Sequence, residues 1–232
     1  MDEKWREYHS RWEGRHWLVR AMEHWDFYGK FHGKLCRHLR PGDTLLDIGS
    51  GKGYSALYFA ALGYTVTGID SDASSVEEAN EWALRMELPA RFQVCDIFRF
   101  HPDRRYRISY SMGLIEHLEP EDAAKLLAIQ CESSELIVAL APTWHSERTV
   151  EPCSIPWIPQ SPATLRRTFA ASGLEVIETF GAGDVTSRWD SRLKAVLPYA
   201  GLHFLQNRIN YAMNVGAVGR LQTADRIARE RD

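Results

Sequence analysis

The sequence predicts an α/β protein built on a doubly wound, seven-stranded and mostly parallel sheet. Two observations predict this fold class. Short apolar runs alternate with helical patterns along the chain, and glycine and proline residues separate them. Strands that are separated by helices are joined by crossovers, which make neighbouring strands parallel. With 232 residues, 44% of them hydrophobic, the chain is long enough for one sizeable core. We therefore expect a single domain with added segments.

The first 40 residues are expected to form a helical cap, and residues 41–232 the sheet domain. Gly14 is expected to interrupt the cap, and a long helix is predicted from about His16 to Leu39. Aromatic side chains at helical spacing usually belong to a core. Four of the eight tryptophans lie in the cap: Trp5, Trp12, Trp17 and Trp25. A Pro-Gly turn then leads into the first strand.

Seven short apolar runs are the predicted strands of the sheet. β-Branched and aromatic residues favour an extended chain in these runs. The first six cover Thr44–Ile48, Tyr64–Ile69, Arg91–Cys95, Arg107–Ser111, Glu135–Leu140 and Leu174–Thr179. The seventh is placed within Ile209–Val218, where Gly216 weakens the pattern.

Helices are predicted between these strands, at residues 54–62, 74–88, 120–131 and 162–171. Ser74 and Glu77 form a capping-box pattern that is expected to open the second helix. Ser161 and Pro162 are expected to cap the fourth. Residues 181–207 are too many for a turn between the last two strands, so a helical insertion is expected there.

Composition and charge argue against several classes of protein. The formal net charge of -3 and the pI near 6.3 show no basic excess of the kind that binds nucleic acid or an anionic membrane. The four cysteines form no Cys-x-x-Cys pair. The charged N-terminus lacks the apolar stretch of a signal peptide, and no apolar run of the sequence has transmembrane length. We therefore expect a cytoplasmic protein with free thiols and no membrane partner.

The central motif is a glycine-rich loop, Asp47-Ile-Gly-Ser-Gly-Lys-Gly53, which follows a predicted strand and opens a predicted helix. Its glycines let the backbone turn sharply and let a ligand approach, and the helix start offers free N–H groups. The dinucleotide pattern Gly-x-Gly-x-x-Gly needs its third glycine one residue later, where Tyr54 stands. A carboxylate at Asp47 would also repel a pyrophosphate. A tight strand–helix turn that binds nothing is the alternative interpretation.

The pattern Asp-x-Gly-x-Gly-x-Gly resembles the first motif of class I S-adenosylmethionine-dependent methyltransferases. Residues 109–118 end in Glu-His-Leu and continue the resemblance, which covers about residues 43–142. It implies a Rossmann-like fold, S-adenosylmethionine as cofactor and S-adenosylhomocysteine as product. It also implies cofactor contacts from Asp47, Gly49, Ser50, Gly51, Gly53, Asp70, Ser71, Asp96, Ile97, Ser111, Met112 and His117.

Three acids, Asp47, Asp70 and Asp96, end three successive predicted strands. Ligands of open α/β sheets bind at those ends. The resemblance implies that Asp47 faces the ammonium of the cofactor and that Asp96 accepts from the adenine amino group, with the Ile97 N–H on a ring nitrogen. Asp70 stands where an acid accepts both ribose hydroxyls. Taken singly, Asp70 is also an ordinary turn or cap residue, and Asp96 an ordinary loop acid.

Histidine is the expected base for a hydroxyl or amine acceptor. His117 is the first candidate and His145 the second, while a structural role for His117 stays open. A carboxylate acceptor would need no base. The resemblance implies that Ser111 and Met112 lie near the transferred methyl group. Some relatives bind a divalent metal through Glu-x-x-Glu-His, but Gly113 replaces the first Glu here, so no metal is predicted.

The acceptor is expected to be an apolar or aromatic small molecule. The cap and two lid segments, near residues 142–160 and 181–207, are expected to cover it, and the first lid carries Trp144 and Trp157. Packing or a homodimer interface is the other interpretation of these tryptophans.

Two other functions stay open. A tRNA or rRNA methyltransferase is one, because residues 1–40 hold nine Lys or Arg against six Asp or Glu; the acidic total and the absence of an RNA-binding motif in the sequence argue against nucleic acid as a partner. The second is a protein of the same fold that binds the cofactor for a different reaction, or that serves as a partner.

Overall fold

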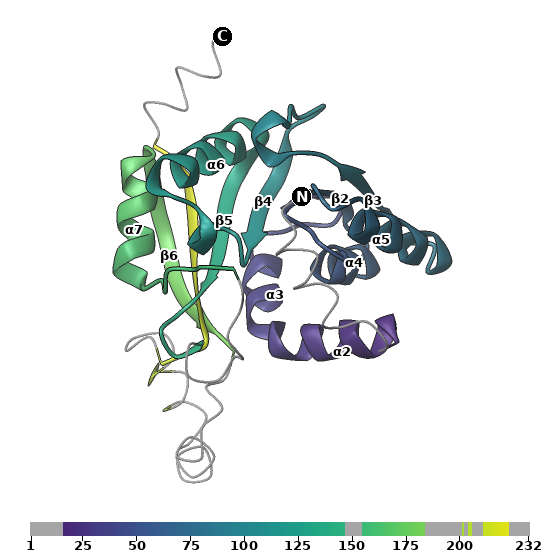
Figure 1. The fold of residues 1–232 in the computed structure, drawn as a ribbon, viewed down its shortest axis with the longest axis horizontal. Helices are drawn as coiled ribbons and strands as arrows, with labels where there is room; N and C mark the ends of the chain where they lie inside the picture. Colours follow the sequence, from purple (N-terminus) through teal and green to yellow (C-terminus); the bar gives the residue numbers. More distant parts are fainter. Residues whose placement is uncertain (1–15, 147–154, 184–200, 202–203, 206–210, 223–232) are drawn as a thin grey trace.

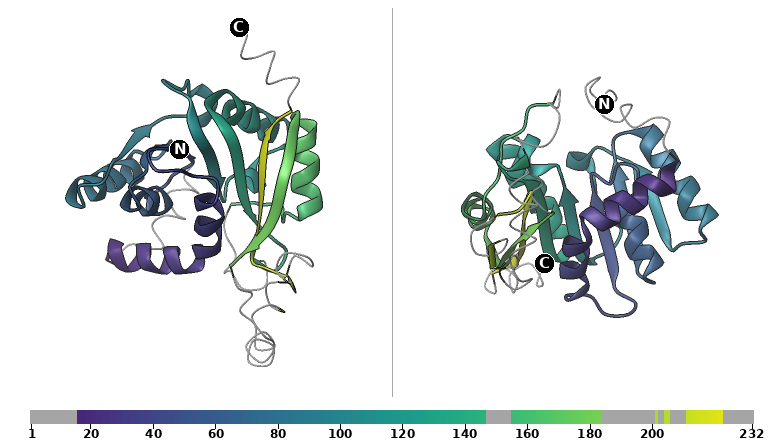
Figure 2. Two further views of the ribbon diagram at one scale, coloured as in Figure 1. Left: turned by 180° about the vertical axis from the view of Figure 1, so that it is seen from behind. Right: turned by 90° about the horizontal axis from the view of Figure 1, so that it is seen from below.

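A seven-stranded sheet with helices on both faces organises the chain (Figure 1; Figure 2). The computed structural model describes residues 16–146, 155–183, 201, 204–205 and 211–222. The strand order is β3-β2-β1-β4-β5-β7-β6, in which β7 runs antiparallel to both of its neighbours. The remaining neighbouring pairs, such as β1 with β2 and β4, are parallel. The predicted fold class is confirmed.

The first six predicted strands are confirmed with small shifts at their ends. The strands are β1 (Thr44–Ile48), β2 (Thr65–Asp70), β3 (Ala90–Val94), β4 (Tyr106–Met112), β5 (Ser134–Pro142), β6 (Leu174–Ala182) and β7 (Asn214–Leu221). The seventh begins later than predicted and extends past Val218. Gly216 lies inside it because the ring of Phe180 on β6 occupies the space of a side chain: a Cβ there would lie 2.4 Å from the ring.

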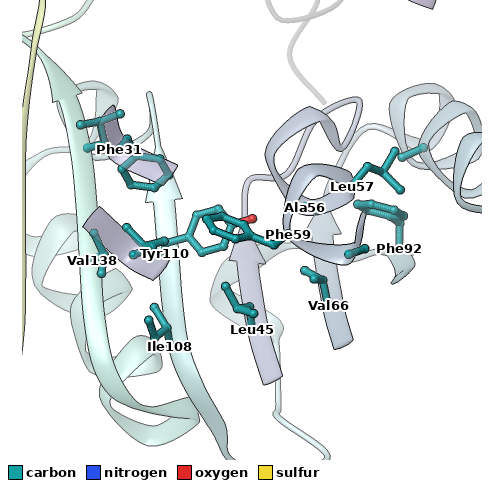
Figure 3. Close-up of a cluster of buried hydrophobic side chains, with 14 of the residues drawn as sticks. Phe31, Leu45, Ala56, Leu57, Phe59, Val66, Phe92, Ile108, Tyr110 and Val138 are labelled. Atoms are coloured by element: carbon teal, nitrogen blue, oxygen red, sulfur yellow. The ribbon is translucent and has the colours of Figure 1, made fainter. Parts of the chain in front are cut away.

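Two hydrophobic cores cover the two faces of the sheet. Leu45 and Leu46 are successive residues of β1 and belong to different cores, since side chains alternate across a strand. Helices α4 (Tyr54–Ala61) and α5 (Ala73–Arg85) contribute to the first core, and α6 (Pro120–Ser133) and α7 (Pro162–Ala171) to the second. Figure 3 shows aromatic side chains of the first core gathered over β1 and β4.

The long helix predicted at the N-terminus is wrong. The chain forms α2 (Trp17–Phe27) and α3 (Gly29–Cys36), and it leaves helical geometry at Tyr28, with φ -97° and ψ 11°. The two helices dock on different elements. Helix α2 packs on α4, whereas Lys34 of α3 forms a 2.5 Å ion pair with Glu178 of β6. Both lie across the carboxyl ends of the central strands (Figure 1; Figure 2).

The cap of α5 also differs from the prediction. The carboxylate of Asp72 accepts hydrogen bonds from the backbone N–H of Ser75, at 3.3 Å, and from its hydroxyl, at 2.7 Å. The helix therefore begins at Ala73, and Ser74 lies inside its first turn. The predicted cap of α7 is confirmed, because Ser161 and Thr164 form a reciprocal capping box.

Parts of several predictions lie outside the described residues. They include Trp5 and Trp12 of the cap, residues 147–154 of the first lid and most of the predicted insertion at 181–207. Residues 201, 204 and 205 of that insertion are helical, and its first two residues belong to β6. In the part of the chain that the structure describes, every helix is too short or too polar to span a bilayer.

Candidate functional site

The glycine loop joins β1 to α4 and is anchored to the end of β2. The backbone N–H groups of Gly49 and Ser50 both donate to the carbonyl of Ile69, at 2.9 and 3.0 Å. Gly49, Gly51 and Gly53 have φ of +75°, +49° and +73°, which side-chain-bearing residues rarely adopt. A Cβ on Gly53 would lie 2.7 Å from the ring of Phe92. Gly49–Gly53 therefore form a tight, half-buried cradle of backbone, as the motif predicted.

Asp70 fastens this cradle to the turn after β2. One of its carboxylate oxygens accepts from the N–H of Gly51 at 2.8 Å, and the other accepts from the N–H of Asp72 at 2.9 Å. Each carboxylate oxygen has two lone pairs, so both keep the capacity to accept a further hydrogen bond. Ser71, between the two acids, is exposed.

Asp47 is buried at the end of β1 and is bonded to Tyr110 on β4. The Tyr110 hydroxyl donates to the Asp47 carboxylate at 3.0 Å. Burial raises the pKa of Asp47 to about 7; the Tyr110 bond lowers it, and the nearby charge of Asp70 raises it. A cation placed beside Asp47 would therefore favour its ionised form near neutral pH.

Asp96 and Ile97 follow β3 along the same edge of the sheet. The Cys95 N–H donates to the Asp70 carbonyl at 2.8 Å, so the ends of β2 and β3 are joined. Asp96 is exposed, and its carboxylate accepts from the Phe98 N–H at 2.9 Å and caps a short 3₁₀ turn, Ile97–Arg99. The three acids thus end three neighbouring parallel strands, β1, β2 and β3.

The end of β4 brings two of the predicted residues beside the loop. The Ser111 hydroxyl is buried and has no hydrogen-bond partner in the described part of the chain, and the same holds for Ser50 of the glycine loop. Met112 accepts through its sulfur from the Ser55 hydroxyl, at 3.1 Å. Buried hydroxyls without partners are uncommon in folded proteins and suit a site that a polar ligand completes.

His117 is held in one tautomer by the backbone. Its Nδ1 lies 2.8 Å from the carbonyl of Pro156, which only accepts, so Nδ1 carries the proton and Nε2 carries the lone pair. Burial lowers the pKa of His117, and the bond to Pro156 raises it. Glu116 lies 3.8 Å from Nε2, and burial raises the pKa of its carboxyl to about 8, so Glu116 is mostly neutral at pH 7.

His145 lies in the segment Thr143–Ser146, called the strap below, which is hydrogen-bonded to the chain just before β7. The strap is anchored where Thr143 and Ser146 donate side-chain hydrogen bonds to the carbonyls of Ala212 and Met213, both at 2.7 Å. The His145 ring is buried and lies 3.8 Å, between ring centroids, from Trp144. The two candidate bases therefore sit on separate segments, one after β4 and the other after β5.

A histidine cluster that the sequence did not predict lies beside the loop. Nε2 of His24 on α2 and Nε2 of His32 on α3 both lie 2.9 Å from the hydroxyl of Ser55 at the start of α4. The same hydroxyl lies 3.1 Å from the Met112 sulfur, so Ser55 contacts three side chains at the start of α4. Burial lowers the pKa of His24 to about 4 and that of His32 to about 3, and both rings are neutral at pH 7.

Two tryptophans of α2 also hold the cap helix on the loop. The indole N–H of Trp17 donates to the carbonyl of Lys52 at 3.4 Å, and that of Trp25 to the carbonyl of Tyr54 at 2.6 Å. Trp17 is buried and stacks on Trp82 at 4.5 Å between centroids, so the core role expected for it is confirmed. Helix α2 and the cradle are thus packed together.

Metal ligands do not gather in the described ranges: no group of three or more His, Cys, Asp or Glu there is placed to hold an ion. The absence of a metal stays a prediction for the chain as a whole.

Comparison with known sequences identifies the type of domain. Residues 45–132 match the profile of a methyltransferase domain family. Ubiquinone biosynthesis O-methyltransferase of Paramagnetospirillum magneticum is 34% identical over 82 residues, which cover 34% of this chain and 33% of that protein. Ribosomal RNA small subunit methyltransferase B of Thermus thermophilus is 29% identical over 118 residues, which cover 41% of this chain and 27% of that protein. These matches span about a third of the relatives' length.

Comparison with solved structures extends the likeness of the fold to most of the chain. Magnesium protoporphyrin IX methyltransferase from Synechocystis PCC 6803, solved with bound SAM, superposes with a TM-score of 0.62 at 14% identity. The superposition covers 95% of this chain and 90% of that one. At this identity the likeness shows the fold alone.

Proposed function

We propose that this chain, which belongs to the class I S-adenosylmethionine-dependent methyltransferases, transfers a methyl group from that cofactor to a small-molecule acceptor. The observation that carries the proposal is the row of three acids beside the glycine cradle. Asp47, Asp70 and Asp96 end three adjacent parallel strands, and the glycine loop beside them turns at Gly49, Gly51 and Gly53 with positive φ and no Cβ atoms. S-Adenosylhomocysteine is the product that this reaction leaves.

The residues present fit an adenosyl cofactor with an ammonium group. The cradle has no Cβ atoms at three positions of positive φ, and the hydroxyls of Ser50 and Ser111 are buried without partners among the described residues. We infer that Asp70 accepts from the ribose hydroxyls and that Asp96 accepts from the adenine amino group. Asp47 is inferred to face the ammonium, because a buried carboxyl near its pKa is stabilised in its charged form by a nearby cation.

The bound cofactor supplies a methyl group on a positively charged sulfur, which is already electrophilic. The chain must therefore align the acceptor with that methyl group and exclude water, and such orientation contributes up to about 7–11 kcal/mol in the best intramolecular cases. We propose that the cap and the segments near residues 142–160 and 181–207 perform this task. Helix α2 is anchored to the loop through Trp17 and Trp25, which supports the role of the cap.

His117 is the proposed base for a hydroxyl or amine acceptor. Its Nδ1 proton is fixed on the Pro156 carbonyl, so the ring's lone pair is on Nε2, the atom that would receive the proton that the acceptor loses. The lowered pKa keeps the ring neutral at pH 7. His145 is the second candidate, since it lies on the strap that follows β5.

An apolar or aromatic acceptor is supported by the side chains exposed on the first lid. Trp144 and Ile158 are 45% and 58% exposed, so both offer apolar surface that an apolar or aromatic acceptor could contact. One similar protein is named for ubiquinone biosynthesis, which supports a small molecule as the acceptor. The similarity to a ribosomal RNA methyltransferase keeps RNA as a second candidate acceptor.

Transfer of a labelled methyl group tests the proposal. The protein is incubated with S-adenosylmethionine that carries a deuterated methyl group, together with a metabolite extract or with total RNA. We expect a labelled small molecule in the extract. Asp70→Ala should abolish the label, whereas Asp103→Ala, at an exposed acid paired with Arg91, should not. His117→Ala should lower the yield of label without weakening cofactor binding. Label in RNA alone, or no label with the wild type, would contradict the proposal.

A further inference from the structure

Tyr110 and Asp47 form a buried pair that the sequence motif does not contain. They lie opposite each other on the parallel strands β4 and β1, so both side chains enter the same core. Tyr110 is 0% exposed and Asp47 is 3% exposed. The Tyr110 ring packs between Phe31 and Phe59, with centroids 5.8 and 5.6 Å away, and it points from β4 toward β1 (Figure 3). The tyrosine therefore has little freedom to move its hydroxyl away from the carboxylate.

The hydroxyl of Tyr110 always donates to Asp47, so it can only lower the pKa of that carboxyl. Burial and the neighbouring carboxylate raise the pKa of Tyr110 well above its usual value, so the phenol stays protonated and donates at every pH of interest. A donor at 3.0 Å stabilises the charged form of Asp47. Asp70, at the end of β2, opposes it by repulsion. His24 and His32, from the helices over this core, are neutral above pH 5 and do not change charge between pH 6 and pH 8.

We propose that Tyr110 is a positioning residue for cofactor binding, whose hydroxyl fixes the Asp47 carboxylate and keeps it charged for the ammonium end of the cofactor. This inference rests on the proposed function, since it assigns Asp47 to that ammonium. It adds a residue of β4, outside the glycine motif, to the parts that control cofactor affinity.

The pH dependence of binding follows from the pair. Asp47 attracts an ammonium only when it is ionised, and its pKa is about 7 in the protein without ligand. Affinity should therefore fall as the pH decreases below 7. Loss of the Tyr110 donor raises the pKa of Asp47 further, because a hydrogen bond to a charged group contributes about 1.5–3 kcal/mol and a pKa unit corresponds to about 1.4 kcal/mol. A rise of one unit would leave about a tenth as much charged Asp47 at pH 6.

Calorimetric titration of S-adenosylhomocysteine into wild type and Tyr110→Phe at pH 6 and pH 8 tests the inference. We expect the variant to bind about tenfold more weakly than wild type at pH 6, and about twofold more weakly at pH 8. The ligand's own amino group stays largely protonated up to pH 8, and any effect of its titration cancels in the ratio of variant to wild type. 5′-Methylthioadenosine, which lacks the ammonium, should bind both proteins equally at either pH.

Two further variants make the result decisive. Tyr106→Phe is the matched control: Tyr106 is also a buried tyrosine of β4, but its hydroxyl bonds to Asp103 at 3.2 Å, so its loss should leave both ratios near one. Asp47→Asn should remove the fall in affinity below pH 7 and does not depend on how Tyr110→Phe folds. Equal ratios at the two pH values for Tyr110→Phe, an equal loss of methylthioadenosine binding, or an unchanged pH profile in Asp47→Asn would overturn the inference. If the wild type binds neither ligand, the proposed function itself fails.

Discussion

Alanine at Gly53 should destabilise the protein much more than alanine at Gly63, although both glycines flank the same helix, α4. Gly53 precedes the helix with φ +73°, and a Cβ there would lie 2.7 Å from the Phe92 ring and 3.0 Å from Cβ of Ala79. Gly63 follows the helix with φ +91°, and a Cβ there would meet no atom within 4 Å. Both substitutions impose a left-handed backbone on alanine, but only one of them also forces atoms into an occupied space.

The magnitudes follow from these two contributions. A left-handed conformation costs an L-residue about 1–2 kcal/mol, and overpacking of a filled site costs about 1–3 kcal/mol more. We therefore expect a loss in the free energy of unfolding of about 2–5 kcal/mol for Gly53→Ala and of about 1–2 kcal/mol for Gly63→Ala. Urea denaturation of the two variants and the wild type, followed by tryptophan fluorescence, measures the difference.

A Gly53→Ala variant that is no less stable than Gly63→Ala would refute this reasoning. That result would mean that Phe92 gives way easily and that the cradle tolerates a side chain. Cofactor affinity offers a second measurement. Gly53→Ala should weaken binding, because a displaced loop no longer presents its backbone to the ligand. Gly63→Ala should leave the affinity unchanged, because Gly63 lies at the far end of the helix.

The remaining predictions concern two buried polar groups outside the glycine loop. Ser55→Ala should lower the free energy of unfolding by about 2–4 kcal/mol, because both histidine Nε2 groups lose their partner; a loss below about 0.5 kcal/mol in urea denaturation would contradict the cluster. Glu116 has a pKa of about 8 in the folded chain and 4.5 as its ordinary value, so the folded state holds a proton that the unfolded state releases, and stability should fall as the pH rises from about 4.5 to 8. Glu116→Gln should remove that contribution, which amounts to at most about 1.4 kcal/mol per pH unit. If the free energy of unfolding changes with pH in the same way for the variant and the wild type between pH 5 and pH 8, the prediction is contradicted.

Most of the sheet could be predicted because its signals are local. Short apolar runs bounded by glycine and proline predict β1 and its neighbours. The cap at Ser161 depends only on four adjacent residues, 161–164. The break at Tyr28 has one local signal, Gly29 directly after it, but a single glycine inside a helical pattern does not fix a helix end. The break also depends on two docking surfaces: α4 for the first helix and β6 for the second. From the sequence alone, Gly216 indicates a weak strand, whereas in the structure it leaves space for the ring of Phe180 on the neighbouring strand.

The acids of the site could be predicted from topology, because parallel strands end at one edge of a sheet. The groups that set their charge could not. Tyr110 lies 63 residues from Asp47 along the chain, and Ser55 lies 31 and 23 residues from the two histidines that contact it. No periodicity or spacing pattern connects such partners, so the structure was needed to bring them together.

A crystal structure of the protein with S-adenosylhomocysteine tests the central claim most directly. The adenosyl group should lie against the backbone of Gly49–Gly53, with the Asp70 carboxylate within hydrogen-bond distance of both ribose hydroxyls. The Asp47 side chain should face the amino group of the ligand. An empty cradle at saturating ligand, or a nucleoside bound elsewhere with these two carboxylates turned away from it, would contradict the account.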